Sequence, residues 1–175
     1  ARKIVSQWQA PLGVFAVTGS PAVDYPEIVS DILAGLPVRW LKDENVSLSY
    51  EDNLINIIGI TCTHRPHQDA PTLKKLLAPH SNLQVLVYHT PDLAPEASAM
   101  GLDLQLSGHT HGGQVRLPWF GAFFTGSLYN NRFEAGSYLL NQMVLYITRG
   151  IGLEGASAPR VRFLCPPEII LWEIS

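Results

Sequence analysis

The sequence predicts an α/β domain whose last part is antiparallel, so that the whole chain can also be described as α+β. An uninterrupted apolar strand over 83–88 is followed by a short helical segment over 95–100 and a second strand over 102–106. This spacing is typical of a βαβ unit in a buried sheet. Beyond Gly136 the pattern changes to strands without helices between them, at 137–141, 143–148, 161–164 and 169–174.

The beginning of the chain supplies a strand and a helix of this fold. The apolar run 13–18 predicts a buried strand, and Gly19-Ser20-Pro21 predicts the loop that follows it. Asp24, with Glu27 three residues later, has the spacing of a capping box. A helix is therefore expected to open at Asp24 and to extend to Gly35.

A hairpin and a second helix come next. The β-rich runs 46–50 and 54–60 are separated by the turn-prone Asp52-Asn53, which predicts a β-hairpin. Asp69 is expected to cap a helix that ends near Pro79. The apolar residues of this helix recur at helical spacing, and they are Leu73, Leu76 and Leu77.

The composition is that of an ordinary globular chain, and one domain is expected over residues 1–175. Hydrophobic residues make up 46% of the sequence, charged residues 15%, and the formal net charge is -3. This balance excludes both the basic surface of a nucleic-acid-binding protein and the polarity of a disordered chain. Cys62 and Cys165 lie far apart without metal-type spacing, so both are predicted to be structural thiols.

The start of the chain predicts a domain that is truncated at its N-terminus. It opens on Ala rather than Met and has no signal-peptide organisation. No window approaches the roughly 18 consecutive apolar residues of a membrane span. The chain is therefore expected to be soluble as given, and the location of the parent protein stays open between cytoplasmic, periplasmic and membrane-associated.

Three of the six histidines follow the predicted βαβ strands. His89 comes directly after the strand over 83–88, and His109 and His111 follow the strand over 102–106. Ligands of open α/β sheets bind outside the carboxyl ends of the strands, so adjacent parallel strands should bring these side chains together. Residues two apart in an extended segment also project to the same side. The glycines around them permit positive φ or close approach to a ligand, and they are Gly108, Gly112 and Gly113.

These three histidines are interpreted as ligands of a transition metal. Neutral imidazole suits zinc and iron, and Mn²⁺ also binds where carboxylates complete the ligand set. The alternative for each histidine alone is a core or surface residue with an ordinary hydrogen-bond partner. The other three, His64, His67 and His80, lie in polar loop-like stretches and are predicted to be solvated, although His64 also follows a strand.

The segment 107–118 resembles the calcineurin-like metallophosphoesterases, in particular a bacterial branch that cleaves phosphodiesters, in some members on lipid-linked substrates. It reads Ser-Gly-His-Thr-His-Gly-Gly-Gln-Val-Arg-Leu-Pro. Residues 89–92 are similar to the His-x-Pro-Asp segment of the same branch. Further similarities, at 11–17, 145–152 and 166–169, extend the resemblance over essentially the whole chain. It implies an αββα sandwich, here without its N-terminal strands.

The resemblance implies a site for two divalent ions, with Mn, Zn or Fe as the candidate metals. It makes His89 and His109 ligands of one ion and His111 a ligand of the other. The family's Asp-x-His and Gly-Asp motifs lie before the point where this chain begins. Where the family has Gly-Asn-His-Asp, this chain reads Gly-Ser-Pro-Ala. Ser20 thus replaces a metal-binding Asn, and Pro21 replaces the histidine that interacts with the scissile phosphate.

Three further residues are weaker candidates for the site. Asp24 would restore the end of the replaced loop if two residues were inserted, although the capping box already explains it. Arg149 and Arg116 could make bidentate contacts with phosphate oxygens. A solvated or structural role is the alternative for each arginine, and Arg149, between a strand and two glycines, is the better candidate. The catalytic groups are otherwise not identified.

The sequence thus predicts a metal-dependent hydrolase of phosphodiesters or phosphomonoesters, whose two-metal site is incomplete in this chain. One alternative is a catalytically degenerate member that acts as a binding or scaffold module. Another is a single zinc held by His89, His109 and His111, with a water in the fourth position. The expected partner is a phosphoester substrate. Because a sheet without its first strands exposes an edge, a second copy or an N-terminal complementing segment is expected to cover it.

Overall fold

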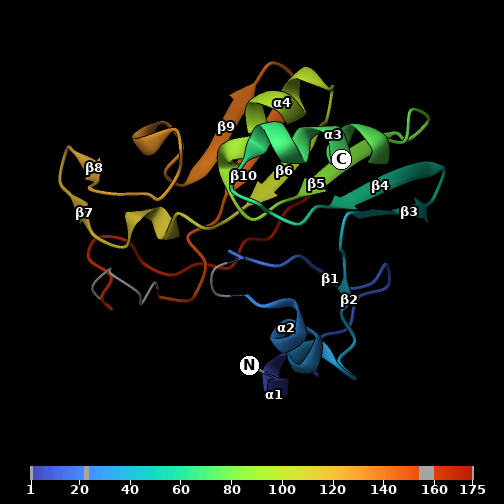
Figure 1. Cartoon of the computed structure of the whole chain (residues 1–175), viewed down its shortest axis with the longest axis horizontal. Helices are drawn as coiled ribbons and strands as arrows, with labels where there is room; N and C mark the ends of the chain where they lie inside the picture. The colour runs from blue at the N-terminus through green and yellow to red at the C-terminus, as the bar shows by residue number, and fades with distance from the viewer. Residues whose placement is uncertain (1, 22–23, 154–159, 175) are drawn as a thin grey trace.

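One six-stranded sheet forms the centre of the computed structural model, which describes residues 2–21, 24–153 and 160–174 (Figure 1). Its strand order is β3-β4-β5-β6-β10-β9. The strands β4, β5, β6 and β10 are parallel, while β3 and β9 pair antiparallel with β4 and β10. The strands are Glu44–Tyr50 (β3), Asn53–Gly59 (β4), Leu83–Val87 (β5), Leu104–Ser107 (β6), Gly136–Leu140 (β9) and Met143–Ile147 (β10). The predicted α/β class, the hairpin and the βαβ unit are confirmed.

Two helices cover one face of this sheet (Figure 1). Helix α3, Pro66–Leu76, connects β4 to β5, and the 3-10 turn η1, Pro91–Leu93, continues into α4, Ala94–Ala99, between β5 and β6. Each connection joins adjacent parallel strands, so the carboxyl ends of β4, β5 and β6 lie at the same edge. The core beneath the helices includes the fully buried residues Ile58, Leu73, Leu86, Tyr88, Leu145 and Ile147.

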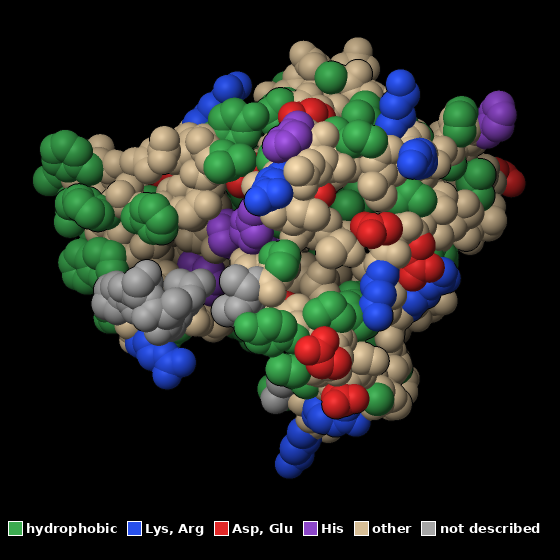
Figure 2. Space-filling model, in the orientation of Figure 1, with side chains coloured by type: hydrophobic (Ala, Val, Ile, Leu, Met, Phe, Trp, Pro, Cys, Tyr) green, Lys and Arg blue, Asp and Glu red, His purple; other side chains and the backbone are tan. Residues whose placement is uncertain are grey.

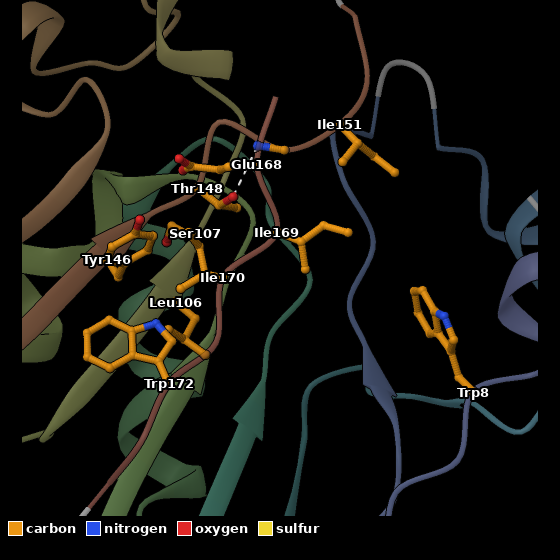
Figure 3. A pocket seen from close by; sticks show the side chains of 11 residues that line it. Trp8, Leu106, Ser107, Tyr146, Thr148, Ile151, Glu168, Ile169, Ile170 and Trp172 are labelled. Atoms are coloured by element: carbon orange, nitrogen blue, oxygen red, sulfur yellow. Dashed lines mark hydrogen bonds between the residues drawn. The ribbon is translucent and has the colours of Figure 1, made fainter. Parts of the chain in front are cut away.

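The opposite face of the sheet is covered by extended chain. The ring of Tyr146 on β10 packs edge to face against Trp172, with centroids 5.3 Å apart. A cavity of about 370 Å³ lies beside this pair, and Trp8 stands across it from Trp172 (Figure 3). The lining is mainly apolar and includes none of the histidines. This cavity is therefore distinct from the place where the predicted metal ligands lie.

The remaining described elements are short. Strand β1 pairs in parallel with β2, and β7 pairs antiparallel with β8. No helix within the described ranges has both the length and the apolar character needed to cross a membrane. The elements are α1 (Arg2–Val5), β1 (Phe15–Ala16), α2 (Pro26–Leu33), β2 (Arg39–Trp40), η2 (His111–Gly113), β7 (Arg116–Leu117), β8 (Gly121–Ala122) and η3 (Asn130–Arg132).

The two predicted acidic helix caps are wrong. Helix α2 begins at Pro26 without a side-chain cap, because the Asp24 carboxylate instead accepts a hydrogen bond of 2.7 Å from the N–H of Gly19. Helix α3 begins at Pro66, three residues before Asp69. The Asp69 side chain is only 3% exposed and turns into the core. In both cases the carboxylate accepts a hydrogen bond from a donor outside the helix, and it therefore does not cap the helix N-terminus as the local sequence pattern predicts.

The two C-terminal strands are also predicted wrongly. Segments 161–164 and 169–174 form no strand, although both are rich in apolar residues. One isolated bridge joins Phe163 to Val115. Apart from that bridge, no backbone ladder partner lies beside either segment in the part of the chain that the structure describes. A segment rich in strand-favouring residues forms a strand only where a neighbouring strand supplies the hydrogen bonds for its backbone.

Candidate metal centre

Two of the predicted ligands, His89 and His109, meet at the carboxyl edge of the sheet. Each lies two residues beyond the end of its strand, which is β5 for His89 and β6 for His109. Nδ1 of His109 lies 3.1 Å from Nε2 of His89, and the two ring centroids are 4.8 Å apart. The N–H of Gly108 also donates to the carbonyl of His89 at 2.9 Å. The two loops are therefore fixed to each other through both backbone and side chains.

Ser20 and His64 join this pair, and we call the four residues Ser20, His64, His89 and His109 the histidine cluster. Ser20 Oγ lies 3.2 Å from Nε2 of His89 and 3.1 Å from Nε2 of His64. The ring centroid of His64 lies 5.1 Å from that of His109. The prediction that His64 is a solvated loop residue is therefore wrong, because it is partly buried within the cluster. The other two loop histidines, His67 and His80, are exposed as predicted.

The position of His64 after a predicted strand is the signal for its place in this cluster, although the polar stretch around it predicts a solvated loop residue. His64 lies five residues beyond the end of β4, and β4 is the parallel neighbour of β5. The rule that placed His89 and His109 at strand ends therefore also applies to His64. The sequence predicts segment 54–60 as half of a hairpin, and this pattern does not reveal its parallel pairing with β5 on the other side.

His111 faces a different neighbour. Its Nδ1 lies 3.5 Å from Nη2 of Arg162, and Nη1 of Arg162 donates to the His111 carbonyl at 3.2 Å. Arg162 also donates to the carbonyls of Arg149 and Gly152, each at 2.7 Å. The guanidinium of Arg162 therefore holds the loop after β10 against His111. Local sequence patterns do not reveal this contact, because 51 residues separate the two partners.

The backbone around these histidines adopts left-handed conformations that side chains other than glycine rarely take. The φ angles are 60° at His64, 69° at His109 and 49° at His111. Such residues cost on the order of 1–3 kcal/mol each and cluster at binding and catalytic sites, where the surroundings enforce them. Gly113 has φ of 80°, and a Cβ there would lie 2.4 Å from that of Ala122. This glycine therefore allows the loop to pack closely against strand β8.

The weaker candidates all have partners within the protein. Nε of Arg149 donates to Oε2 of Glu168 at 2.7 Å, and its backbone N–H donates to Oε1 at 2.9 Å. Arg116 forms an ion pair of 2.9 Å with Glu134. The structure thus gives each arginine a structural partner, and contact with phosphate would require an exchange of that partner. Asp24 is held by the Gly19 N–H, next to Ser20.

The spacing within the histidine cluster suits neighbouring ligands around one ion. Zinc–nitrogen bonds of about 2.0–2.1 Å place adjacent ligand atoms about 2.8–3.0 Å apart in octahedral geometry and about 3.3–3.4 Å apart in tetrahedral geometry. The separations within the cluster are 3.1, 3.2 and 3.1 Å. Within the described ranges, however, no three His, Cys, Asp or Glu side chains converge at metal-binding geometry. The described donors therefore have the spacing of neighbouring ligands but do not make up a complete ligand set.

Burial lowers the pKa of His109 below its usual value of 6.5, and the neighbouring His64 lowers that pKa further. Metals bind the neutral form of imidazole, so a lowered pKa keeps His109 ready to act as a ligand at neutral pH.

The same shift predicts a loss of stability in acid. Because the folded-state pKa of His109 lies below the unfolded value of about 6.5, the unfolded chain binds more protons between the two values. The free energy of unfolding should therefore fall as the pH is lowered through this window. In urea titrations at a series of pH values, we expect His109→Gln to show a shallower fall than the wild-type chain. The exposed His80 supplies the control His80→Gln, and equal pH dependence in all three proteins would contradict this assignment.

Comparison with known proteins finds no matching family model but several relatives. The chain is 31% identical over 166 residues to the UDP-2,3-diacylglucosamine pyrophosphatase LpxG of Chlamydia trachomatis, which covers 90% of this chain and 47% of that protein. It is 37% identical over 90 residues to the uncharacterized metallophosphoesterase YkuE of Bacillus subtilis, covering 51% and 30%. It is also 37% identical over 98 residues to the phosphodiesterase YaeI of Escherichia coli, covering 55% and 34%.

The chain thus spans between 30% and 47% of the length of these three relatives. The match to LpxG extends over 90% of the chain, beyond the motif at 107–118. The names of these relatives, metallophosphoesterase, pyrophosphatase and phosphodiesterase, agree with the family that the motif at 107–118 resembles. The chain belongs to the calcineurin-like metallophosphoesterase family.

Proposed function

We propose that this chain supplies the histidine ligands of a metal-dependent phosphoester hydrolase whose site holds two divalent ions. The observation that supports this most directly is the approach of His89 Nε2 to His109 Nδ1, 3.1 Å apart at the carboxyl edge of two parallel strands. The names pyrophosphatase and phosphodiesterase among the relatives describe cleavage at phosphorus. Phosphodiesters and phosphomonoesters are therefore the proposed substrates.

In this proposal His89 and His109 hold one ion and His111 holds the other, with Mn, Zn or Fe as candidates. Divalent ions bound there would polarise the phosphoryl oxygens and lower the pKa of a bound water. Ser20 contacts both His89 and His64, so its hydroxyl is placed to orient these imidazoles. His64 adds an N–H donor beside Ser20, close to where the family's phosphate-contacting histidine is replaced by Pro21. It is therefore suited to donate a hydrogen bond to a phosphoryl oxygen.

The proposed site is incomplete, because no carboxylate joins the histidine cluster in the part of the chain that the structure describes. Asp24 is engaged with the Gly19 N–H. Asp92 is 1% exposed, and its Oδ1 accepts hydrogen bonds from Ser127 Oγ at 2.6 Å and Leu128 N–H at 3.1 Å. We therefore propose that the remaining ligands belong to residues beyond these 175.

A second candidate is a binding or scaffold module without catalysis. Two observations favour it. Ser20 and Pro21 stand where the family has Asn and His, and no set of three metal-type side chains converges in the described part of the chain. A module of this kind would retain the fold and the histidines without turnover.

Metal stoichiometry together with turnover separates the candidates. The purified chain would be equilibrated with Mn²⁺ or Zn²⁺, dialysed and analysed by elemental mass spectrometry. In parallel, hydrolysis of bis(4-nitrophenyl) phosphate would be followed with added Mn²⁺. Two bound ions with turnover would support the hydrolase and contradict the proposed incompleteness of the site, and one ion would support the single-zinc alternative. No ion without turnover fits either the incomplete site or the binding module, and the same assay on a longer chain that carries the remaining ligands separates these two. Light scattering on the same sample tests the expected association with a second copy.

A further inference from the structure

The β7–β8 hairpin and the loop after it present aromatic side chains to solvent, and we call residues 117–128 the aromatic hairpin. The exposed fractions are 100% for Trp119, 80% for Phe120, 84% for Phe123 and 73% for Phe124. Hydrophobic side chains gather over this side of the molecule, at the left of the view (Figure 2). Contiguous apolar surface on a soluble protein marks an interaction site for a protein or a membrane, whereas single exposed residues need no explanation.

These aromatic residues do not stabilise the fold. Trp119 has φ of 66°, a left-handed conformation that is unfavourable for a bulky side chain, and no burial offsets this cost. The hairpin is instead anchored through Ala122, whose N–H donates to Glu134 Oε1 at 3.2 Å and whose carbonyl accepts from Asn131 Nδ2 at 2.9 Å. The anchor faces the protein and the aromatic rings face away from it. The exposed aromatic rings are therefore expected to have a role other than stabilising the fold.

The charges around the aromatic hairpin suit an anionic surface. The sequence from 117 to 131 contains no charged side chain, and arginines flank it at Arg116 and Arg132. The nearby Glu134 is neutralised by its ion pair with Arg116 at 2.9 Å. Arg132 is exposed, and within the described ranges it forms no ion pair. No acidic group that would repel an anionic surface is therefore present in 117–131. At its edge lies the exposed Arg132, whose guanidinium also contacts the rings of Tyr129 and Phe133.

A second cation lies at the base of the aromatic hairpin. Phe163 forms a β-bridge with Val115, and the N–H of Arg116 donates to the Phe163 carbonyl at 3.0 Å, so segment 160–164 runs beside the first strand. Arg160 in this segment is exposed and unpaired among the described residues. Among the described residues, the exposed charge beside the hairpin is thus positive, although the chain as a whole carries a formal charge of -3.

We propose that the aromatic hairpin docks on an anionic lipid bilayer. The side chains of Trp119, Phe120, Phe123 and Phe124 would lie at the boundary between headgroups and acyl chains, where aromatic rings are favoured. Arg132 and Arg160 would face the anionic headgroups. A protein partner is a weaker match, because residues 117–124 carry only one side chain with a hydrogen-bonding group, the Trp119 indole, and protein interfaces need a polar rim.

Docking in this way would bring the histidine cluster to the membrane surface. Nε2 of His109 lies 3.3 Å from the carbonyl of Gly126, within the aromatic hairpin. The inference does not depend on the proposed hydrolysis, because membrane binding can be measured without any turnover.

The test is co-sedimentation of the 175-residue chain with phosphatidylcholine vesicles that contain phosphatidylglycerol. Joint replacement of Trp119, Phe120, Phe123 and Phe124 by alanine should lower the partition coefficient by about 10-fold or more. The combination Arg132→Gln with Arg160→Gln should lower it on these vesicles and leave it unchanged on pure phosphatidylcholine. Brominated lipids should quench the tryptophan fluorescence of the wild-type chain and quench it less in Trp119→Phe.

The matched control replaces four exposed aliphatic residues elsewhere by alanine, namely Ile4, Ile28, Ile32 and Leu139. This control should bind vesicles as the wild-type chain does, and circular dichroism should show that all variants are folded. Wild-type binding that is absent, or that is equal in the aromatic variant, would overturn the proposal. The wild-type chain could instead fail to bind vesicles but form dimers, with the aromatic variant remaining monomeric. That result would assign the aromatic hairpin to contact with a second copy of the chain.

Discussion

Alanine in place of His109 should lower the affinity of the chain for Zn²⁺ by about 100-fold or more. Loss of a group that merely supports a metal ligand typically costs about 10- to 100-fold in affinity, so loss of a direct ligand should cost at least the upper end of that range. His89→Ala should have the same effect, because its Nε2 lies 3.1 Å from His109 Nδ1. His111→Ala should instead remove the other proposed ion and leave the first. Calorimetric titration with a competing chelator measures each affinity.

His80→Ala is the control for these histidine variants, because His80 is exposed and lies outside the histidine cluster. It should bind Zn²⁺ as the wild-type chain does. Thermal unfolding checks that each variant remains folded. If folded His109→Ala retained the wild-type affinity, the histidine cluster would not be a metal site, and the hydrolase proposal would lose its main structural support.

The contact between His89 and His109 could be predicted because it depends on local patterns and one general rule. Each histidine follows an apolar run, and the two runs are joined by a short helical connection that enforces parallel neighbours. Parallel neighbours have their carboxyl ends at the same edge. The sequence contains all of this information within about 30 residues, a typical length for one βαβ unit.

The contribution of Ser20 could not be predicted in this way. Ser20 belongs to the loop after β1, which pairs with β2 outside the six-stranded sheet. Its approach to His89, 69 residues away, depends on how that small sheet packs. The helix cap predicted at Asp24 fails for a related reason, because a capping box and a hydrogen bond to Gly19 compete for one carboxylate. The sequence shows only the first of these two possibilities.

Replacing Asp69 by alanine should lower the free energy of unfolding by about 3 kcal/mol, because hydrogen bonds to a buried charge contribute roughly 1.5–3 kcal/mol and their loss leaves donors unpaired. The Asp69 carboxylate is 3% exposed and accepts hydrogen bonds from Thr63 Oγ1 at 2.8 Å, Thr63 N–H at 3.0 Å and the Tyr88 hydroxyl at 2.5 Å. Burial raises the pKa of Tyr88, and the hydrogen bond to Asp69 raises it further, so the phenol stays protonated and remains a donor.

Tyr88→Phe should cost less, about 1.5 kcal/mol, because Asp69 would keep both bonds from Thr63. The double variant should be less destabilised than the sum of the two single variants, since each single change leaves the other partner unpaired. Urea unfolding measures all three, with Asp52→Ala in an exposed turn and Tyr50→Phe, 55% exposed, as controls. Additive effects, or an Asp69→Ala change no larger than that of Asp52→Ala, would contradict the network. Thr63 directly precedes His64, so a loss of this network should also loosen the loop that brings His64 to Ser20.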